Sequence, residues 1–388
     1  MILSPDQQNA LDEILVWYKD AGRAPYITLG GYAGTGKTTL MGALKKELLG
    51  ISPELRVAFC SYTGRAAQNL RNKLKQESAY SVRDSISTIH SLIYTPIEDE
   101  EGCIAGWERA DSLEADLIIV DEASMVDGAI WRDLLSFQIP VIAVGDHGQL
   151  PPISGAFSLM RSPDLTLTHI HRQAMDNPII RVSEMARTTG KIPPAVYGSG
   201  VVKYLNGDEG AGERIGELLE NYRTDTLVLC GYNSTRAKIN GFIRSSLGLD
   251  SPKPVAGDRV ICLKNNHRKA ICNGMLGTIT EIYDADDKWY DAEIKMDESD
   301  KPYSGFIYAP QFGSAAPLNF SGKGKRLPLA GDYFDFGYAL TVHKAQGSQA
   351  RRVVMLEERF SRMDDDMWRR WLYTGITRAE EELYLFGN

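Results

Sequence analysis

Residues 31–38, GYAGTGKT, decide the fold of this chain. They follow a short apolar run at 26–29 and precede a helical pattern of leucines that begins at Leu40. A strand, a glycine loop and a helix in this order turn backbone N–H groups and the positive end of the helix dipole toward an anion. Lys37 is expected to reach the β- and γ-phosphates, and the Thr38 hydroxyl to hold Mg²⁺. The chain is therefore predicted to bind a nucleoside triphosphate.

A second nucleotide element is expected after the apolar run LIIV at residues 117–120. A continuous apolar run is typical of a parallel strand that is buried on both faces. It ends in Asp121 and Glu122, at the edge of the sheet where the phosphate loop also lies. Asp121 suits the Mg²⁺ shell, and Glu122 suits the general base that orients water for attack on the γ-phosphate. The alternative is an Asp-Glu pair that only caps the next helix.

A third strand is expected at 140–144, and the segment GDHGQLPP follows it. The amide of Gln149 both donates and accepts hydrogen bonds, so it can sense a γ-phosphate or a positioned water. Strands expected at about 26–30, 56–61, 117–121 and 140–145 alternate with helical stretches. This alternation predicts a doubly wound α/β domain with its site at the carboxyl ends of the strands.

Composition limits the class of protein. A chain of 388 residues is expected to hold about two to four domains. No apolar run approaches the ~20 residues of a membrane span, and the first residues lack the basic region of a signal peptide. The five cysteines form no C-x-x-C pair, which argues against a metal site or a disulfide framework. We expect a reduced, cytoplasmic protein. The net charge of −8 argues mildly against a protein coated in nucleic acid.

The order of the motifs resembles that of the superfamily 1 helicases. The combination of STIH at 87–90 with VHKAQGS at 342–348 is similar to the RecD/Dda-like branch, superfamily 1B, whose members move 5′ to 3′ on single-stranded DNA. The resemblance covers nearly the whole chain and implies ATP and Mg²⁺ as cofactors. The further matching segments are SYTGRAA at 61–67, DEASM at 121–125, GDHGQLPPI at 145–153, HRQ at 171–173 and YTGITRA at 373–379.

The resemblance assigns further residues to the nucleotide. Gln7 would read the adenine edge, although alone it would be judged a surface residue. Arg172 and Arg378 would offset charge on the γ-phosphate in the transition state, because a planar guanidinium suits its oxygens. Without the flanking motifs, surface salt bridges would be the simpler interpretation of both arginines. The other residues implied to bind the nucleotide are Gly31, Gly34, Thr35, Gly36, Thr39, Gln346 and Gly347.

Another set of residues matches positions where this family contacts DNA. Hydroxyl and imidazole groups suit contacts to the phosphate backbone that carry no sequence information. For Thr63 and Thr88 a role as turn or helix-cap residues is an open alternative. The residues implied to bind DNA are Thr63, Arg65, Thr88, His90, Thr341 and His343.

The fold class implied is α/β, with two RecA-like doubly wound lobes and two insertions. The first lobe is expected at 1–164, with a hairpin at about 92–113 that forms the strand-separating pin of the family. Trp107 is the candidate for stacking on a base there, worth ~1–3 kcal/mol, or else it anchors the hairpin to the lobe. The second lobe is expected at 165–252 and 331–388, around a small SH3-like β-barrel at 253–330. A basic loop at 321–326 could touch nucleic acid or be solvated.

The hydrophobic pattern of the sequence also predicts strands and helices within the second lobe and the barrel. In the second lobe, strands are expected at 227–230, 336–340, 353–356 and 383–386, and a helix between 363 and 378. Asn233, Arg236 and Asn240 resemble a helix motif of the family. In the barrel, alternation predicts strands at 257–263, 278–283 and 289–296.

The sequence thus predicts an ATP-driven DNA helicase that steps 5′ to 3′ along one strand. Its expected partners are single-stranded DNA, junctions of single- and double-stranded DNA and candidate replication or repair proteins, with no membrane, and the protein is expected to be a monomer. One alternative is a superfamily 1B helicase that acts on RNA. Another is a nucleotide switch that recruits partners without unwinding.

Overall fold

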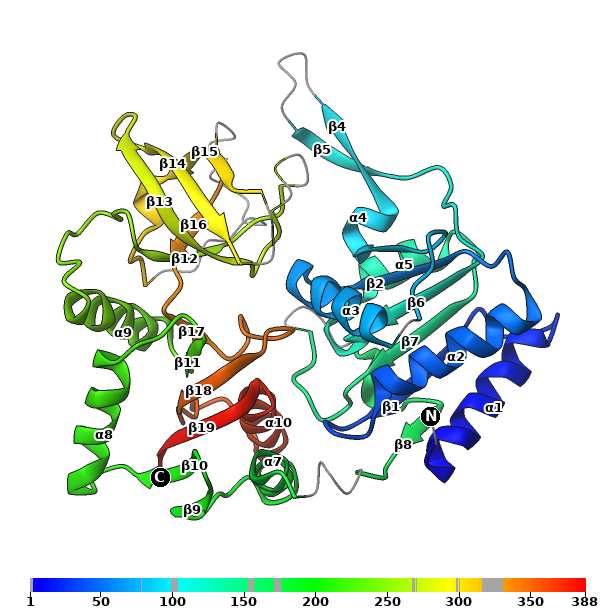
Figure 1. Cartoon of the computed structure of the whole chain (residues 1–388), viewed down its shortest axis with the longest axis horizontal. Coiled ribbons are helices and arrows are strands. Elements are labelled where there is room, and N and C mark those ends of the chain that lie inside the picture. Colours follow the sequence, from blue (N-terminus) through cyan, green and yellow to red (C-terminus); the bar gives the residue numbers. More distant parts are fainter. Residues whose placement is uncertain are drawn as a thin grey trace. The chain divides into compact units, whose positions relative to one another are not determined.

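The computed structural model describes residues 3–77, 79–98, 104–152, 157–170, 176–266, 269, 271–297, 299, 301–315 and 331–388. The chain divides into two compact units, Met1–Ile180 and Arg181–Asn388 (Figure 1). Among the residues just given, no helix has the length and apolar character that crossing a membrane requires.

The first unit is built on a parallel sheet of six strands in the order β3-β2-β6-β7-β1-β8. The four strands expected from apolar runs are confirmed. Two shorter strands, β3 and β8, were not predicted, and β8 pairs with β1 although its residues were assigned to the second lobe. The bounds are β1 Tyr26–Gly31, β2 Val57–Ser61, β3 Ser85–Thr88, β6 Leu117–Asp121, β7 Val141–Gly145 and β8 Leu165–Leu167.

Helices cover both faces of this sheet. Alternate residues of β6 face opposite layers: Leu117 and Ile119 belong to one core cluster, and Ile118 and Val120 to another. The first cluster packs against α1, α2 and α3, and the second against α4 and α5, which is the doubly wound arrangement. The bounds are α1 Pro5–Lys19, α2 Lys37–Ile51, α3 Gly64–Gln76, α4 Ile89–Ile93, α5 Gly128–Leu135, and the 3-10 turns Ala123–Met125 and Leu159–Arg161.

A β-hairpin projects from the first unit where an insertion was predicted (Figure 1). Its strands are β4 (Tyr94–Glu98) and β5 (Ile104–Arg109), which pair in antiparallel fashion. Trp107 lies opposite Pro96 in the middle of this ladder. The residues between the two strands lie outside the described part of the chain.

The second unit contains another six-stranded sheet, in the order β17-β11-β18-β19-β10-β9. All neighbours are parallel except the edge pair β9 and β10. The bounds are β9 Ala195–Gly198, β10 Val201–Leu205, β11 Thr226–Cys230, β17 Ala339–Thr341, β18 Ala350–Leu356, β19 Ala379–Gly387, α7 Pro178–Thr189, α8 Glu209–Glu220, α9 Asn233–Ser246 and α10 Asp365–Ile376.

An antiparallel sheet of five strands, in the order β15-β14-β13-β12-β16, interrupts this unit. A bridge between Ile307 and Asp332 joins β15 to the residues just before β16, so the two edges of the sheet meet. β16 lies after residue 330, and we therefore propose that the barrel extends to about Phe336. The bounds are β12 Arg259–Cys262, β13 Leu276–Asp284, β14 Trp289–Met296, β15 Tyr303–Tyr308, β16 Phe334–Phe336 and the 3-10 turn Ala309–Gln311.

The single strand predicted at 336–340 is wrong. The chain leaves the five-stranded sheet at Phe336 and enters the six-stranded sheet at Ala339. Gly337 stands between them, pressed against the neighbouring strand: a Cβ atom there would lie 2.7 Å from the carbonyl carbon of Val260. Apolar residues continue through this change of sheet, so their pattern did not reveal it.

Candidate functional site

The phosphate loop connects the end of β1 to the start of α2. Gly34 and Gly36 have φ angles of 81° and 74°, which side chains other than glycine rarely adopt. Gly36 is also the N-cap of α2, so free N–H groups of the first helical turn open onto the loop. The Thr35 hydroxyl donates to the Tyr32 carbonyl at 2.8 Å and fixes the turn. This backbone is shaped to bind an anion.

Lys37 lies over the loop that precedes it. Its Nζ donates to the carbonyl oxygens of Gly31 at 2.7 Å and Tyr32 at 3.1 Å. Gly31 has no room for a side chain, because a Cβ atom would lie 2.6 Å from the Thr35 hydroxyl oxygen. The sequence therefore places a positive charge at the anion-binding loop itself.

Gln7 is buried, so the interpretation of Gln7 as a surface residue is wrong. Its Nε2 donates to the carbonyls of Thr35 at 3.0 Å and Gly36 at 3.4 Å. Its Oε1 accepts from the backbone N–H of Ser4 at 2.9 Å, as part of the capping box of α1. Gln7 thus holds α1 to the phosphate loop. Its contact with adenine stays a prediction.

Asp121 and Glu122 stand at the carboxyl end of β6, two strands from the phosphate loop in the same sheet. Burial raises the pKa of Asp121, the charge of Glu122 raises it further, and Lys73 and Lys37 act in the opposite direction. Glu122 adopts a left-handed φ of 53°, which is uncommon for a residue with a side chain. The structure thus places two carboxylates next to each other at this edge, and their binding of a divalent cation stays a prediction.

The donors expected to hold Mg²⁺ fit this chemistry. Mg²⁺ binds oxygen atoms, and in nucleotide sites the protein commonly supplies one or two of them beside the phosphates. Thr38, at the start of α2, and Asp121 offer a hydroxyl and a carboxylate. In the part of the chain that the structure describes, no group of three or more His, Cys, Asp or Glu side chains forms a metal cage.

The loop after β7 brings Gln149 to the same edge. The Asp146 carboxylate accepts from the backbone N–H of Gly148 at 2.9 Å, and Gln149 is buried. The ring of His147 packs against that of Tyr32 in the phosphate loop, with centroids 4.1 Å apart. Sequence reasoning missed this pair, because both positions lie inside recognised motifs but were treated as spacers. The contact joins the loop that carries Gln149 to the phosphate loop.

In the second unit, Arg378 is held by the segment that contains Gln346 and Gly347. Its Nη1 donates to the Ser348 carbonyl at 3.2 Å and its Nε to the Thr374 carbonyl at 3.0 Å. Arg378 is buried, so the alternative of an exposed salt bridge is wrong. Gly347 has a φ of 75°, which shapes this loop. Arg172 lies outside the described residues.

Thr63 and Thr88 are both helix caps, as the alternative interpretation required. The Thr63 hydroxyl accepts from the Ala66 N–H at 3.2 Å at the start of α3, and Thr88 accepts from the Ser91 N–H at 3.1 Å at the start of α4. Thr63 lies two residues after the end of β2, Thr88 is the last residue of β3, and Arg65 lies in the first turn of α3. Their contacts with DNA stay predictions.

His90 and Trp107 meet at the hairpin. The His90 ring lies 4.6 Å from that of Trp107, edge to face, and 4.6 Å from that of Tyr94. This contact is what the anchoring alternative predicts for Trp107, which sits in mid-strand and not at the hairpin end. Stacking of Trp107 on a base stays a prediction.

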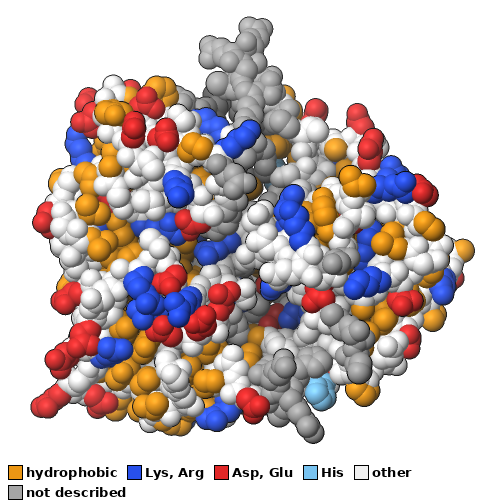
Figure 2. All heavy atoms as spheres, viewed as in Figure 1, with side chains coloured by type: hydrophobic (Ala, Val, Ile, Leu, Met, Phe, Trp, Pro, Cys, Tyr) orange, Lys and Arg blue, Asp and Glu red, His pale blue; other side chains and the backbone are white. Residues whose placement is uncertain are grey.

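Thr341 and His343 lie at the carboxyl end of β17. Thr341 is buried, and its carbonyl accepts from the Ala345 N–H at 3.1 Å. Burial lowers the pKa of His343, which favours its neutral form. Acidic side chains are interspersed with Lys and Arg on the face shown in Figure 2. The basic loop expected at 321–326 lies outside the described residues.

Comparison with known proteins agrees with this arrangement. A family model described as an AAA domain matches residues 2–199, and one described as a UvrD-like helicase C-terminal domain matches residues 336–386. The chain belongs to the AAA-domain family. Its similarity to RecD2, Dda and RecD proteins places it in the RecD/Dda-like branch, superfamily 1B.

The relatives of this superfamily 1B chain differ in length. It is 30% identical to the ATP-dependent RecD2 DNA helicase of Deinococcus radiodurans over 100% of this chain but 49% of the relative, so it spans about half of that protein. It is 24% identical to the ATP-dependent DNA helicase Dda of Enterobacteria phage T4, covering 98% of each chain. A Bacteroides Pif1 helicase solved with ADP-AlF3 and single-stranded DNA shares the fold, with a TM-score of 0.56, 18% identity and coverage of 99% and 92%.

Proposed function

We propose that this protein is an ATP-driven motor that moves 5′ to 3′ on single-stranded DNA and separates duplex DNA. The proposal rests on the residues that lie together at one edge of the first sheet. Lys37 over the phosphate loop and the carboxylates of Asp121 and Glu122 meet there. The names of the RecD2 and Dda relatives support DNA as the track.

Residues of the first unit have separate proposed roles in binding and hydrolysing ATP. Lys37 and the N–H groups of the loop bind the phosphates, while Gln7 and Thr35 keep the loop in shape. Glu122 orients the attacking water and accepts its proton. Mg²⁺, held by Thr38 and Asp121, would offset charge on the β- and γ-phosphate oxygens. Gln149, on the loop joined to the phosphate loop, senses the γ-phosphate.

Arg378 supplies the positive charge that the transition state needs, and Arg172 has the same proposed role. The hydrogen bonds of Arg378 hold its guanidinium between the Thr374 carbonyl of α10 and the Ser348 carbonyl, which lies two residues after Gln346. We propose that the loop that contains Gln346 transmits the state of the bound nucleotide, ATP or ADP, to the segment at Thr341 that is assigned to DNA. Hydrolysis is thereby coupled to stepping.

Strand separation on two partial duplexes tests the proposal. One duplex carries a 5′ single-stranded tail and the other a 3′ tail, each incubated with ATP and Mg²⁺. Unwinding of the 5′-tailed substrate alone is expected. Unwinding of only the 3′-tailed substrate would keep the motor and contradict the direction.

Stimulation of the ATPase by poly-dT and by poly-U is a second test. An ATPase rate that neither polymer changes would contradict a nucleic-acid motor, and stronger stimulation by poly-U would favour RNA as the track.

A further inference from the structure

Three polar residues of α9 share one face of the helix. Arg236, Asn240 and Arg244 are spaced four residues apart, so they lie above one another. All three are buried, with exposed fractions of 7%, 1% and 6%. Buried polar groups need hydrogen-bond partners. Here the partners come from the two connections between the six-stranded and the five-stranded sheets, from Asp335 in β16 and from the Ser314 carbonyl.

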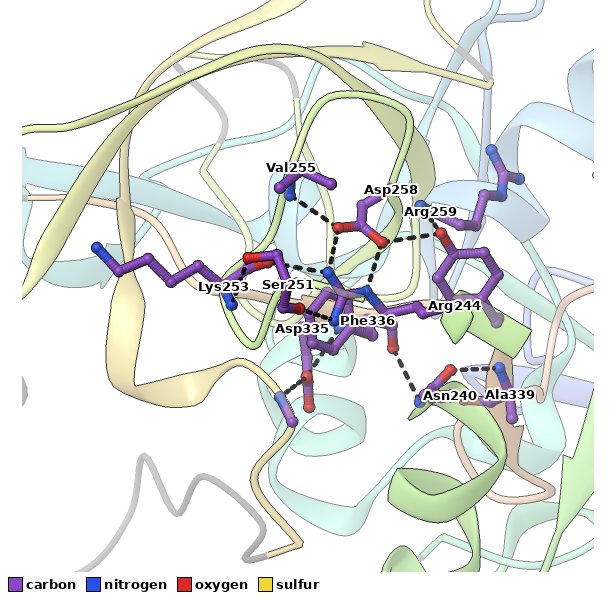
Figure 3. Close-up of polar contacts among 12 residues, drawn as sticks. Asn240, Arg244, Ser251, Lys253, Val255, Asp258, Arg259, Asp335, Phe336 and Ala339 are labelled. Carbon is purple, nitrogen blue, oxygen red and sulfur yellow. Dashed lines mark hydrogen bonds and ion pairs between the residues drawn. The ribbon is translucent and has the colours of Figure 1, made fainter. Parts of the chain in front are cut away.

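Arg244 binds the connection that enters the five-stranded sheet. Its guanidinium makes a bidentate contact with Asp258, 2.7 and 2.9 Å long, just before β12 (Figure 3). It also donates to the carbonyls of Ser251 at 2.7 Å and Lys253 at 2.9 Å. One side chain therefore holds the whole turn that leads from α9 into the barrel.

Asp258 extends this contact to the connection that leaves the sheet. It is fully buried and accepts from the Val255 N–H at 2.8 Å and the Tyr338 hydroxyl at 2.9 Å. The Tyr338 oxygen in turn accepts from the Arg259 N–H at 3.1 Å. Tyr338 lies between β16 and β17, so both connections share one set of hydrogen bonds.

Asn240 and Arg236 bind the outgoing connection directly. Asn240 Oδ1 accepts from the Ala339 N–H at 2.8 Å, and its Nδ2 lies 3.4 Å from the carbonyls of Phe336 and Ala339 (Figure 3). Arg236 pairs with the buried Asp335 at 2.8 Å. Both sides of the change from β16 to β17 are thus fixed to α9.

We propose that Asn240 and Arg244 are positioning residues that hold β17 and the barrel as one rigid body. β17 ends at Thr341, which the proposed function assigns to DNA, so this inference rests on that function. A barrel joined to the six-stranded sheet only by two chain connections could rotate about them. A filled set of buried hydrogen bonds resists such rotation, because any tilt leaves polar groups unpaired. Lys344 adds a contact from the same segment to Asn273 of the barrel at 3.3 Å.

Hydrogen exchange tests the rigid connection. Asn240→Leu keeps a side chain that branches at Cγ but offers neither the acceptor nor the donor. In the full chain we expect exchange of the backbone amides at 335–341 to become about tenfold faster or more, because the Ala339 N–H loses its partner. Exchange in β10, four strands from β17 in the same sheet, is expected to stay unchanged. Arg244→Lys, which keeps the charge beside Asp258 but loses the planar fork, gives a second variant should Asn240→Leu fail to fold.

The ATPase reaction separates positioning from general support. We expect Asn240→Leu to raise the oligo-dT concentration for half-maximal stimulation about tenfold, with kcat at saturating oligo-dT changed less than about twofold. Lys203→Met is the matched control. It breaks another buried ion pair of the same unit, with Glu357 at 2.5 Å, away from both connections. This control is expected to leave the half-maximal concentration unchanged.

The outcomes separate this inference from the proposed function. Faster exchange at 335–341 with an unchanged response to oligo-dT would overturn the positioning role. An equal rise in the half-maximal concentration for Lys203→Met would overturn it as well. If oligo-dT leaves the ATPase rate of the wild type unchanged, the proposed function is wrong. The exchange data then decide alone whether Asn240 fixes β17: unchanged rates at 335–341 overturn the rigid connection, and faster rates uphold it.

Discussion

Two lysines of α2 show how position along one helix sets the role of a residue. Lys37, in the first turn, donates to carbonyls of the phosphate loop and carries its charge to the site. Lys45, further along, is fully buried and pairs with the buried Asp84 at 2.7 Å. The first charge is available to a ligand, and the second is used entirely within the fold.

Replacement of Lys37 by Ala is expected to lower the ATPase kcat by about 10²–10³ or more, because one preorganised donor to developing charge is lost. Steady-state ATPase with saturating oligo-dT measures this. Lys46→Ala is the matched control, since Lys46 is exposed on the same helix. Equal loss in both variants would contradict a specific role for Lys37.

Lys45→Met is expected to lower the free energy of unfolding by about 3–5 kcal/mol, because the buried Asp84 carboxylate loses its ion-pair partner. Chemical denaturation of the full chain measures the loss. Lys46→Met serves again as the exposed comparison and should change stability by less than about 0.5 kcal/mol. A small effect at Lys45 would show that Asp84 is adequately satisfied by its backbone donors, the N–H groups of Val57 and Ser81.

At the scale of elements, α1 binds two segments that are far from it in the sequence, the phosphate loop and the segment after β8. Gln7 in its first turn binds the phosphate loop, and the neighbouring Asp6 accepts from the backbone N–H groups of Thr168 at 3.1 Å and His169 at 2.9 Å. One turn of helix therefore fixes both the nucleotide loop and the segment that follows β8.

This arrangement predicts a pH dependence. Burial alone would raise the pKa of Asp6, but hydrogen bonds from Ser4 and from the backbone of His169, Thr168 and Gln7 outweigh it, so the pKa is lowered. A carboxyl with a lowered pKa stabilises the fold above its ordinary pKa of about 3.9 and loses that effect as pH falls through the lowered value.

Thermal unfolding of wild type and Asp6→Asn across pH measures this effect. The wild type is expected to be the more stable at pH 6, and the difference should shrink as pH falls below about 4. A difference that stays constant over this range would show that the charge of Asp6 contributes nothing.

The hairpin offers a second prediction at this scale. Because the Trp107 ring packs on His90, Trp107→Ala should speed hydrogen exchange in β4 and β5 and slow unwinding, with stimulation of the ATPase by oligo-dT preserved. Slower unwinding with unchanged exchange would instead favour stacking of Trp107 on a base.

At the scale of the whole molecule, charge sets the expected mode of DNA binding. The net charge is −8, and among the residues assigned to DNA only Arg65 carries a permanent positive charge. The affinity for oligo-dT should therefore depend weakly on salt, with a slope of log K against log salt between about −0.7 and −2, at about −0.7 per neutralised phosphate. Fluorescence anisotropy of labelled oligo-dT across a salt series measures the slope. A slope steeper than about −5 would show that further cations bind the backbone.

Features that neighbouring residues encode could be predicted from the sequence alone. The glycines, Lys37 and Thr38 form one contiguous segment, and the runs of β2, β6 and β7 are long and apolar enough to mark buried strands. The family followed from the order of such segments. Shorter strands escaped, because the three residues of β8 give too little periodicity to detect.

Which distant segments meet could be seen only in the folded chain. Gln7 reaches the phosphate loop, His147 packs on Tyr32, and Trp107 on His90, across separations that no local pattern records. The change of sheet between β16 and β17 is also invisible in the sequence, because both sheets bury the same apolar residue types there. Local hydrogen bonding and hydrophobic periodicity fix the elements. Their pairing depends on contacts between residues far apart along the chain, which form only when the elements pack.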